Sequence, residues 1–256
     1  MADEHGASPV AEGDRFRGQV VLVTGSSSGI GAATARAFDR AGATVVVNSA
    51  RSIEAGERVA AELTDASYRQ ADVADPAQAD DLVAHCVERH GSLDVLVNNA
   101  GTTSLIPHGD LEAADPEVWR RIFDVNVFGT WQVTVAAVPH LRASGRGQVL
   151  NVSSVAGDRP TGSSIPYACS KAALSHMTRL LANVLGPEVR VNAVAPGLVD
   201  TPWTADWALA REFVEAQAPL RRSGTPEDVA ECIIGLARSD YMTGQVVLVD
   251  GGLSLR

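Results

Sequence analysis

The feature of this chain that most constrains its fold is a repeated alternation of short apolar runs with longer helical stretches. The runs are rich in Val, Leu and Ile and are mostly continuous, which is typical of strands buried on both faces of a parallel sheet. They are expected at residues 20–24, 44–48, 67–71, 95–98, 148–152, 189–193 and 246–249. Helices are expected between them at 32–40, 54–63, 76–89, 116–141, 167–185 and 226–237. This order predicts βαβ units wound into a Rossmann-type α/β fold, a doubly wound parallel sheet.

No shift in composition divides the chain. Residues 19–256 are therefore predicted to form one domain of about seven strands with helices on both faces. Residues 1–18 are polar and rich in Gly and Ala, and we interpret them as a flexible extension. Residues 198–220 break the alternation and hold Trp203 and Trp207, two of the four tryptophans. A connection of this length is either a lid over a functional site or a surface excursion with two helical turns.

Charge and cysteine usage exclude several classes of protein. The 256 residues include 31 acidic and 21 basic side chains, and the resulting net charge of −10 disfavours nucleic acid as a partner. No run approaches the ~18 apolar residues that a membrane span needs, so no membrane partner is expected. Cys86, Cys169 and Cys232 are too few and too scattered for a disulfide framework or a zinc site. The chain is therefore predicted to be cytoplasmic, with reduced cysteines and no bound metal.

A glycine-rich turn follows the first predicted strand and precedes a helix. Its sequence is TGSSSGIG over residues 24–31. Glycines at such a junction allow a tight bend and let a pyrophosphate approach the N–H groups of the helix N-terminus. A glycine-rich turn alone is often only a tight turn, but its place at the first βα junction indicates a dinucleotide site. The predicted contacts are Gly25, Ser27, Ser28, Gly29, Ile30 and Gly31.

The second predicted strand ends where a Rossmann fold reads the adenine ribose. An acidic residue there selects NAD, but this chain has Ser49 and Arg51 and no carboxylate. Arg51 is either a partner for the 2′-phosphate of NADP or an ordinary solvated arginine. The third and fourth strands end in small and polar residues that would face the same crevice, although each could be a cap or turn residue. These are Asp72, Val73, Asn99, Ala100 and Gly101.

A second cluster carries acid–base chemistry. Tyr167 and Lys171 are spaced i, i+4 and share a helix face, where a lysine ammonium would lower the tyrosine pKa from ~10. Such a phenol can protonate a carbonyl or deprotonate an alcohol, although the spacing also occurs by chance in surface pairs. Ser154 ends the fifth strand and could polarise the same carbonyl oxygen. Asn126 lies in a predicted helix and is either a structural bridge or a water-binding member of the site.

The motifs TGSSSGIG, DV, NNAG, VN, SS, YACSK, PG and VDGG occur in this order. From residue 18 to 252 the chain resembles the short-chain dehydrogenase/reductase family, and its C-terminal half resembles the branch of 3-ketoacyl-carrier-protein reductases. The resemblance implies a homotetramer, a catalytic acid/base at Tyr167, a ribose-binding Lys171, a substrate-orienting Ser154 and a water-holding Asn126. It also implies a cradle for the nicotinamide, formed by Pro196, Gly197, Val199 and Thr201.

The sequence therefore predicts an enzyme that transfers hydride between a nicotinamide and a small ketone or secondary alcohol. NADP(H) is the expected cofactor, because Ser49 stands where the family's NAD-selecting aspartate would be. Two alternatives stay open: a dehydrogenase of the same family that prefers NAD(H), and a protein that senses the dinucleotide without catalysis. The sequence does not indicate the substrate, the direction of reaction, or whether an acyl carrier protein or coenzyme A carries the substrate.

Overall fold

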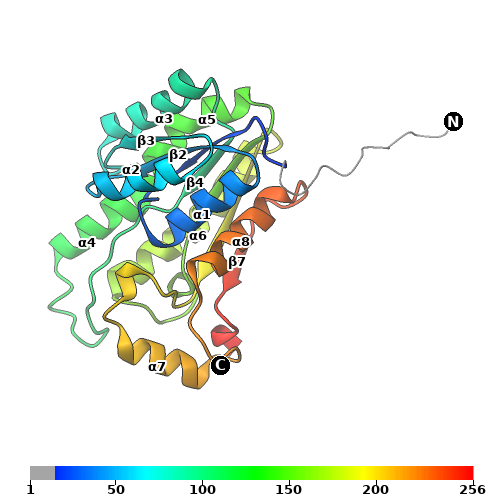
Figure 1. The fold of residues 1–256 in the computed structure, drawn as a ribbon. Coiled ribbons are helices and arrows are strands. Elements are labelled where there is room, and N and C mark those ends of the chain that lie inside the picture. The colour runs from blue at the N-terminus through cyan, green and yellow to red at the C-terminus, as the bar shows by residue number, and fades with distance from the viewer. Residues whose placement is uncertain (1–14, 256) are drawn as a thin grey trace.

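The computed structural model describes residues 15–255, which form one parallel sheet covered by helices on both faces (Figure 1). The seven strands pair in the order β3-β2-β1-β4-β5-β6-β7, and every pair is parallel. The predicted Rossmann-type sheet is confirmed. The strands are β1 (Val20–Val23), β2 (Thr44–Ser49), β3 (Ala66–Gln70), β4 (Val95–Asn98), β5 (Gly147–Val152), β6 (Val189–Pro196) and β7 (Val246–Val249).

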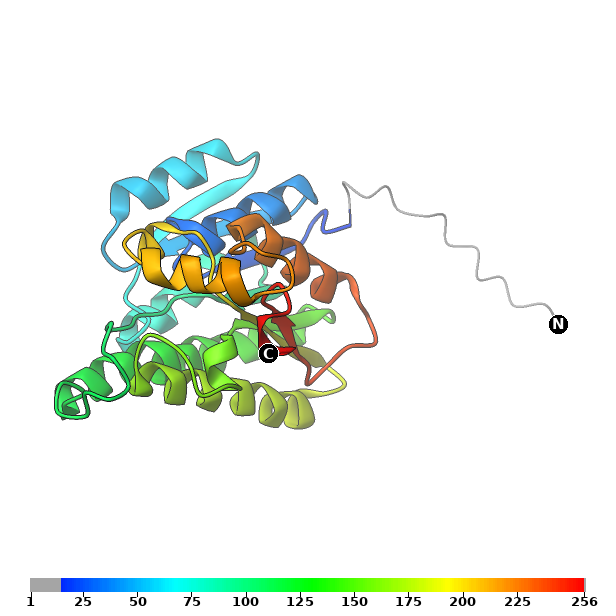
Figure 2. The ribbon, with the colours of Figure 1, turned by 90° about the horizontal axis from the view of Figure 1, so that it is seen from below.

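The helices lie in two layers. Residues of α1, α2 and α8 form one buried cluster against the sheet, and residues of α3, α5 and α6 form the other. Figure 2 shows the blue and cyan helices of the first layer on one side of the molecule and the green helices on the other. The helices are α1 (Gly29–Arg40), α2 (Ile53–Glu62), α3 (Pro76–His90), α4 (Pro116–Phe123), α5 (Thr130–Ala143), α6 (Ile165–Leu185), α7 (Ala208–Gln217) and α8 (Pro226–Arg238).

Local sequence signals explain where several helices begin. Asp75 and Asp115 each accept hydrogen bonds from two backbone N–H groups in the first turn that follows, and a proline occupies the first helical position. Thr225 and Asp228 form a reciprocal capping box at α8. These caps satisfy N–H groups that lack a partner within the helix, and they fix where the chain enters each helix from the sheet.

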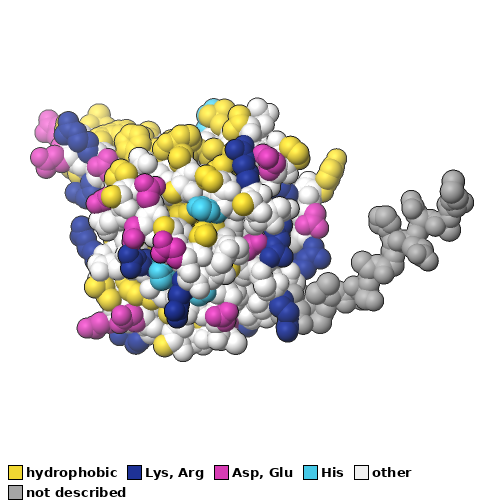
Figure 3. All heavy atoms as spheres, turned by 90° about the horizontal axis from the view of Figure 1, so that it is seen from above, with side chains coloured by type: hydrophobic (Ala, Val, Ile, Leu, Met, Phe, Trp, Pro, Cys, Tyr) yellow, Lys and Arg dark blue, Asp and Glu magenta, His cyan; other side chains and the backbone are white. Residues whose placement is uncertain are grey.

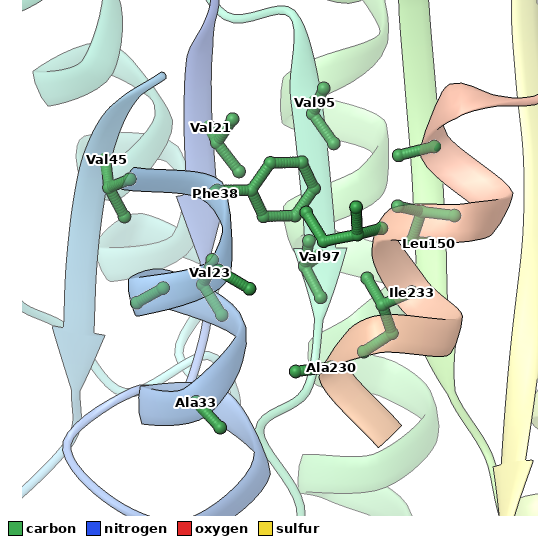
Figure 4. Packing of buried hydrophobic residues seen from close by; sticks show 14 of the residues in the cluster. Val21, Val23, Ala33, Phe38, Val45, Val95, Val97, Leu150, Ala230 and Ile233 are labelled. Atoms are coloured by element: carbon green, nitrogen blue, oxygen red, sulfur yellow. The ribbon is translucent and has the colours of Figure 1, made fainter. Parts of the chain in front are cut away.

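The core on the α1 and α8 side is organised around Phe38. This side chain is fully buried between α1 and the sheet, next to Val21 and Val97, as Figure 4 shows. Ile233 of α8 reaches the same cluster. The ring of Phe16 meets Phe38 edge-on at a centroid distance of 5.0 Å, an arrangement that aromatic pairs favour.

The role of Phe16 corrects the predicted domain boundary. The first fourteen residues of the proposed flexible extension, 1–18, lie outside the described residues. The last four belong to the domain: Phe16 is 2% exposed, its N–H donates to Ala41 O at 2.9 Å, and Arg15 forms an ion pair with Asp240. A single aromatic residue in a polar segment gave no periodic signal of burial, so its packing was missed.

The predicted helix over residues 116–141 is interrupted. A π-helical turn, η2 (Asp124–Gly129), separates α4 from α5. Asn126 in this turn hydrogen-bonds to Thr102 rather than facing solvent. Gly129 lies against Val73, where an added Cβ would come within 2.8 Å of a Val73 methyl group. The widened turn brings Asn126 to the sheet edge, and π-bulges of this kind are frequent at functional sites.

Candidate active site

A cleft of about 1170 Å³ opens at the carboxyl ends of the strands. In doubly wound sheets ligands bind at this edge. Of the predicted site residues, all but Gly31 and Asn126 line the cleft. Gly31 lies beneath the glycine-rich turn, where an added Cβ would be 2.5 Å from Gly25 O, and Asn126 is fully buried behind the wall. The structure thus brings together residues from positions 25 to 201.

Two asparagines form hydrogen bonds to the backbone of the glycine-rich turn. Asn48 Oδ1 accepts from Gly25 N at 3.2 Å, and Asn99 Nδ2 donates to the carbonyls of Thr24 and Gly25 at 2.9 Å. Gly25 has φ +63°, and a Cβ there would approach Ala100 Cα to 2.8 Å, so the backbone itself requires glycine. Asn48 is a structural residue that the sequence analysis did not single out.

The helix that follows this turn fits a pyrophosphate. α1 begins at Gly29, and the side chain of the preceding Ser28 makes no capping hydrogen bond. The first N–H groups of α1 therefore have no side-chain cap, and Ser28 and Gly29 line the cleft. The helix α1 is twelve residues long, and its N-terminus follows the glycine-rich turn. This arrangement is suited to binding an anion. These residues would hold the diphosphate of a dinucleotide.

The ribose end of the cleft contains Ser49 and Arg51, as predicted. Ser49 is buried, and its hydroxyl shares a 2.9 Å hydrogen bond with the Tyr68 hydroxyl. Arg51 is exposed on the cleft wall. Of the two, Arg51 is therefore the side chain better placed to reach a ligand, because the Ser49 hydroxyl already has a protein partner.

The chemical end of the cleft is formed by β5 and α6. Ser154 follows β5, and Tyr167 and Lys171 lie one turn apart at the start of α6. Ser164 caps α6 and accepts from Tyr167 N at 3.4 Å. Lys171 is buried, and its Nζ donates to Val152 O at 2.8 Å and lies 5.7 Å from the centre of the Tyr167 ring.

The protonation equilibria of this pair differ from the prediction. Burial raises the pKa of Tyr167 above its usual value, and a hydrogen bond with Ser154 opposes the rise only in part. Burial also lowers the pKa of Lys171 to about 8. The predicted lowering of the tyrosine pKa is therefore wrong for the protein without its ligands. The charged forms of both side chains lose hydration in the cleft wall, and this loss sets the direction of both pKa shifts.

Asn126 bridges segments that are distant in the sequence. Its Oδ1 accepts from Thr102 N at 2.8 Å, and its Nδ2 donates to Thr102 O and to Ser170 Oγ, each at 3.0 Å. A Cβ added at Gly101 would lie 3.4 Å from Asn126 Oδ1 and 3.7 Å from Lys171 Nζ, so the two polar groups border one small space. Asn126 therefore forms a structural bridge, one of the two roles that the sequence allowed, and it lies next to Lys171.

Residues 198–220, which we call the lid segment, cover one side of the cleft. They contain a turn of 3₁₀ helix (Pro202–Thr204) and α7. Arg211 holds the segment together through Asp200 at 2.7 Å and Thr204 O at 2.6 Å. The ring of Trp203 meets that of Tyr167 edge-on at 6.3 Å. The large apolar side chains of this segment that line the cleft include Trp203, Trp207, Leu209 and Phe213.

Another part of the cleft lining was not predicted. It consists of residues in the loop after β4 beyond Gly101, with one residue each of α4 and η2: Thr102, Leu105, Ile106, Pro107, His108, Arg121 and Val125. Ser163 ties this loop to the segment before Tyr167, because its carbonyl accepts from Ile106 N at 2.8 Å and its hydroxyl contacts that of Thr103 at 2.6 Å. A single histidine in a loop and a single arginine in a helix show no spacing from which the sequence could have identified them.

The sequence analysis also expected no bound metal and no membrane span. Within residues 15–255 no cluster of three or more His, Cys, Asp or Glu side chains is arranged to hold a metal ion. In the same range, none of the helices combines the length and the apolar character that crossing a membrane would require.

A glycine-rich turn that fits a diphosphate and a Ser–Tyr–Lys group line one cleft, an arrangement typical of an oxidoreductase that works with a dinucleotide cofactor. Residues 25–254 match the family model described as enoyl-(acyl carrier protein) reductase. The chain is 61% identical over 239 residues to a Streptomyces violaceoruber protein described as ketoacyl reductase 2 of the granaticin polyketide synthase, covering 92% of this chain and 96% of the relative. The chain belongs to the short-chain dehydrogenase/reductase family.

More distant relatives agree with this assignment. The 3-oxoacyl-acyl-carrier-protein reductase FabG of Thermotoga maritima is 39% identical over 255 residues, covering 93% of this chain and 99% of the relative. A crystal structure of a short-chain dehydrogenase/reductase from Burkholderia xenovorans superposes with a TM-score of 0.87 at 38% identity, covering 93% and 98% of the two chains. The predicted family, its resemblance to ketoacyl reductases and the enzyme class acting on C=O and CH–OH groups are confirmed.

Proposed function

We propose that this protein reduces a ketone to a secondary alcohol with NADP(H), and that Tyr167 is the proton donor. The observation that carries the proposal is that Ser154, Tyr167 and Lys171 lie together in a cleft that also contains the glycine-rich turn suited to the diphosphate of a dinucleotide. The nicotinamide supplies the hydride when bound. Tyr167 Oη donates its proton to the carbonyl oxygen as negative charge develops there, and Ser154 Oγ donates a hydrogen bond to the same oxygen. Lys171 Nζ binds the nicotinamide ribose.

The proposed substrate is a 3-ketoacyl group of the polyketide type. Two features support this class. A relative described as a polyketide ketoacyl reductase shares 61% of its residues over 239 positions, and the lid segment presents indole, leucine and phenylalanine side chains to the cleft. Incubation with NADPH and a 3-ketoacyl thioester, carried on acyl carrier protein or on coenzyme A, tests the proposal. Loss of reduced cofactor with formation of the 3-hydroxy product is expected, and no turnover with either carrier would contradict it.

The cofactor preference gives the first prediction. Arg51 can pair with the 2′-phosphate of NADP through charge-assisted hydrogen bonds, which contribute about 1.5–3 kcal/mol. We therefore expect kcat/KM to favour NADP(H) over NAD(H) by roughly 10- to 100-fold. The variant Arg51→Ala should lose most of that preference. Steady-state kinetics with both cofactors measures it.

Arg58 is a matched control for Arg51. It is exposed on α2, which begins two residues after Arg51, but it does not line the cleft. Arg58→Ala should keep the preference of the parent protein. Equal efficiency with both cofactors in the parent, or an unchanged preference in Arg51→Ala, would show that the protein is an NAD(H)-preferring or dual-specificity member of the family.

We propose that the protein is a homotetramer, and this assembly gives the second prediction. Exposed apolar residues gather on η2, α5 and α6: Phe128, Trp131, Val135, Leu180 and Val184 are between 45% and 64% exposed. Figure 3 shows hydrophobic side chains crowded along its upper edge, the side on which α5 and α6 lie. An exposed patch of this kind marks an interface, and closed symmetric assemblies are usual. Sedimentation velocity at micromolar concentration should show a tetramer.

Substitutions on this face sharpen the test of assembly. A charge at Val184 should dissociate the assembly, because a buried unpaired carboxylate is costly. Val184→Glu is expected to sediment as a smaller species, and Glu57→Gln, an exposed change on α2, should not alter the species. A stable monomer of the parent protein would contradict the proposed tetramer.

The lid segment gives the third prediction. We propose that residues 198–220 close over bound ligands and exclude water from the reacting carbonyl. Hydrogen exchange of this segment should slow when NADPH and a 3-hydroxyacyl product are both present, while exchange in α8 stays unchanged. Exchange that is equally slow with and without ligands would identify the segment as a rigid structural element.

We also propose that the protein works in the cytoplasm. Its three cysteines are free thiols, and they differ in environment: Cys86 is buried, Cys232 is half-buried and Cys169 is exposed. An exposed free thiol is typical of a reducing compartment.

A further inference from the structure

The structure points to a second polar site in the cleft, and we infer that Arg121 and His108 bind an acidic oxygen at the end of the substrate remote from the reacting carbonyl. The inference rests on the proposed function, because it concerns the substrate of the same cleft. The ligand would be a carboxylate or an enolised 1,3-dicarbonyl, both of which present an oxyanion.

Arg121 is placed to act on a ligand rather than on the protein. Its guanidinium donates to Ser104 Oγ at 2.5 Å, and no ion pair joins it to a carboxylate within residues 15–255. The cleft wall contains two carboxylates, Asp72 and Asp206, and neither is within ion-pair distance of Arg121. Arg121 lines the same wall as Val125, one turn further along the chain. In a protein of net charge −10, a cleft arginine without a carboxylate partner attracts an anion.

His108 supplies a second, independent observation. Its Nε2 is enclosed, yet it has no hydrogen-bond partner among the residues that the structure describes. Buried polar atoms are nearly always hydrogen-bonded, and an orphan at the wall of a cavity calls for a ligand or a water. His108 also lines the cleft, so a rotation of its ring would let a bound oxygen satisfy this nitrogen.

The distance to the reacting centre follows from a short chain of contacts. Thr102 N donates to Asn126 at 2.8 Å, and Ser104, two residues later, contacts Arg121 at 2.5 Å. Two residues of extended chain span at most about 7 Å, so the guanidinium lies within roughly 15 Å of the Asn126 amide. The loop is fixed at this distance by the contacts of Ser163 with Thr103 and Ile106. A substrate whose acidic oxygen lies about eight bonds, roughly 10 Å, from its carbonyl is short enough to fit this limit.

The experiment uses two probes, 9-oxodecanoate and its methyl ester, which share the ketone and the chain length and of which only the first is charged. For the parent protein with NADPH, kcat/KM should favour the acid by at least roughly tenfold. Arg121→Gln should remove this preference, so that acid and ester have similar kcat/KM, and Arg121→Lys should restore part of it. His108→Phe, which keeps an aromatic ring, should weaken the preference.

Two control variants separate recognition from structure. Arg120 is the neighbouring arginine on α4, is exposed and does not line the cleft, so Arg120→Gln should keep the preference for the acid. Ser104→Ala removes the hydrogen bond to Arg121 but keeps the charge. If Ser104→Ala lowers kcat/KM for acid and ester alike, and Arg121→Gln does the same, Arg121 only holds the loop and the inference falls.

A binding measurement keeps this inference separate from the proposed function. Calorimetric titration of each probe into the protein with NADPH gives dissociation constants that do not require turnover. Tighter binding of the acid that Arg121→Gln abolishes supports the site even if neither probe is reduced, in which case the proposed reaction fails instead. Equal binding of acid and ester, or no binding of either, would overturn the inference.

Discussion

Replacing Tyr167 by phenylalanine is expected to lower the turnover number by roughly 10²–10⁴-fold or more, the usual contribution of general acid–base catalysis. The ring would keep its edge-on contact with Trp203, so packing changes little. What is lost is the proton that the phenol transfers to the carbonyl oxygen. The affinity for NADPH, measured by calorimetry, should stay near that of the parent protein, because the glycine-rich turn and Arg51 are untouched.

Tyr241 offers the matched control for this substitution. It is fully exposed and lies outside the cleft lining, and Tyr241→Phe should leave turnover unchanged. A Tyr167→Phe variant that turns over within tenfold of the parent would remove Tyr167 from the role of proton donor. Another donor in the cleft would then be needed, and Ser154 would be the first to examine.

Replacing Phe38 by alanine is expected to lower the free energy of unfolding by about 3–5 kcal/mol, the typical cost of removing a fully buried aromatic ring. Phe38 fills the space between α1 and the sheet, and it is the partner of Phe16. A domain of this kind is stable by only about 5–15 kcal/mol, so the loss is a large share. Urea unfolding at a fixed protein concentration measures it.

Phe213 is the control for Phe38, because it is 59% exposed in the lid segment. Phe213→Ala should change the free energy of unfolding by no more than about 0.5 kcal/mol, as surface substitutions usually do. A loss below about 1 kcal/mol in Phe38→Ala would mean that the surrounding side chains collapse into the space. Phe16→Ala should destabilise the protein as well, since Phe16 caps the same cluster.

The sheet and most of the cleft could be predicted because their sequence signals are local. Continuous apolar runs mark strands buried on both faces, and the glycine turn and the Tyr167–Lys171 spacing depend on one βα junction and one helix face. The parallel topology then brings their carboxyl-terminal ends together. For this reason most of the nineteen predicted residues that line the cleft needed no knowledge of distant contacts, whereas Pro196, Gly197, Val199 and Thr201 came from the family resemblance.

The features that could not be predicted depend on contacts between distant segments. The π-helical turn at Asp124–Gly129 arises because Asn126 bonds to Thr102 and Gly129 meets Val73, and neither partner is visible from a helical pattern. The direction of the Tyr167 pKa shift was wrong because burial is a property of the folded wall and not of residue spacing. Phe16 was missed for the same reason, since its partner Phe38 is twenty-two positions away.

The position of Trp203 has a practical consequence. Its indole lies at the wall of the cleft, edge-on to Tyr167 and close to Gly101. Indoles emit in the near ultraviolet, where a reduced nicotinamide absorbs, so a bound reduced cofactor would quench Trp203 by resonance energy transfer. Trp207 also lines the cleft, whereas Trp119 and Trp131 lie on α4 and α5, outside its lining. The protein thus contains its own fluorescent probes of cofactor binding, and comparing Trp203→Phe with Trp207→Phe would separate their signals in unlabelled protein.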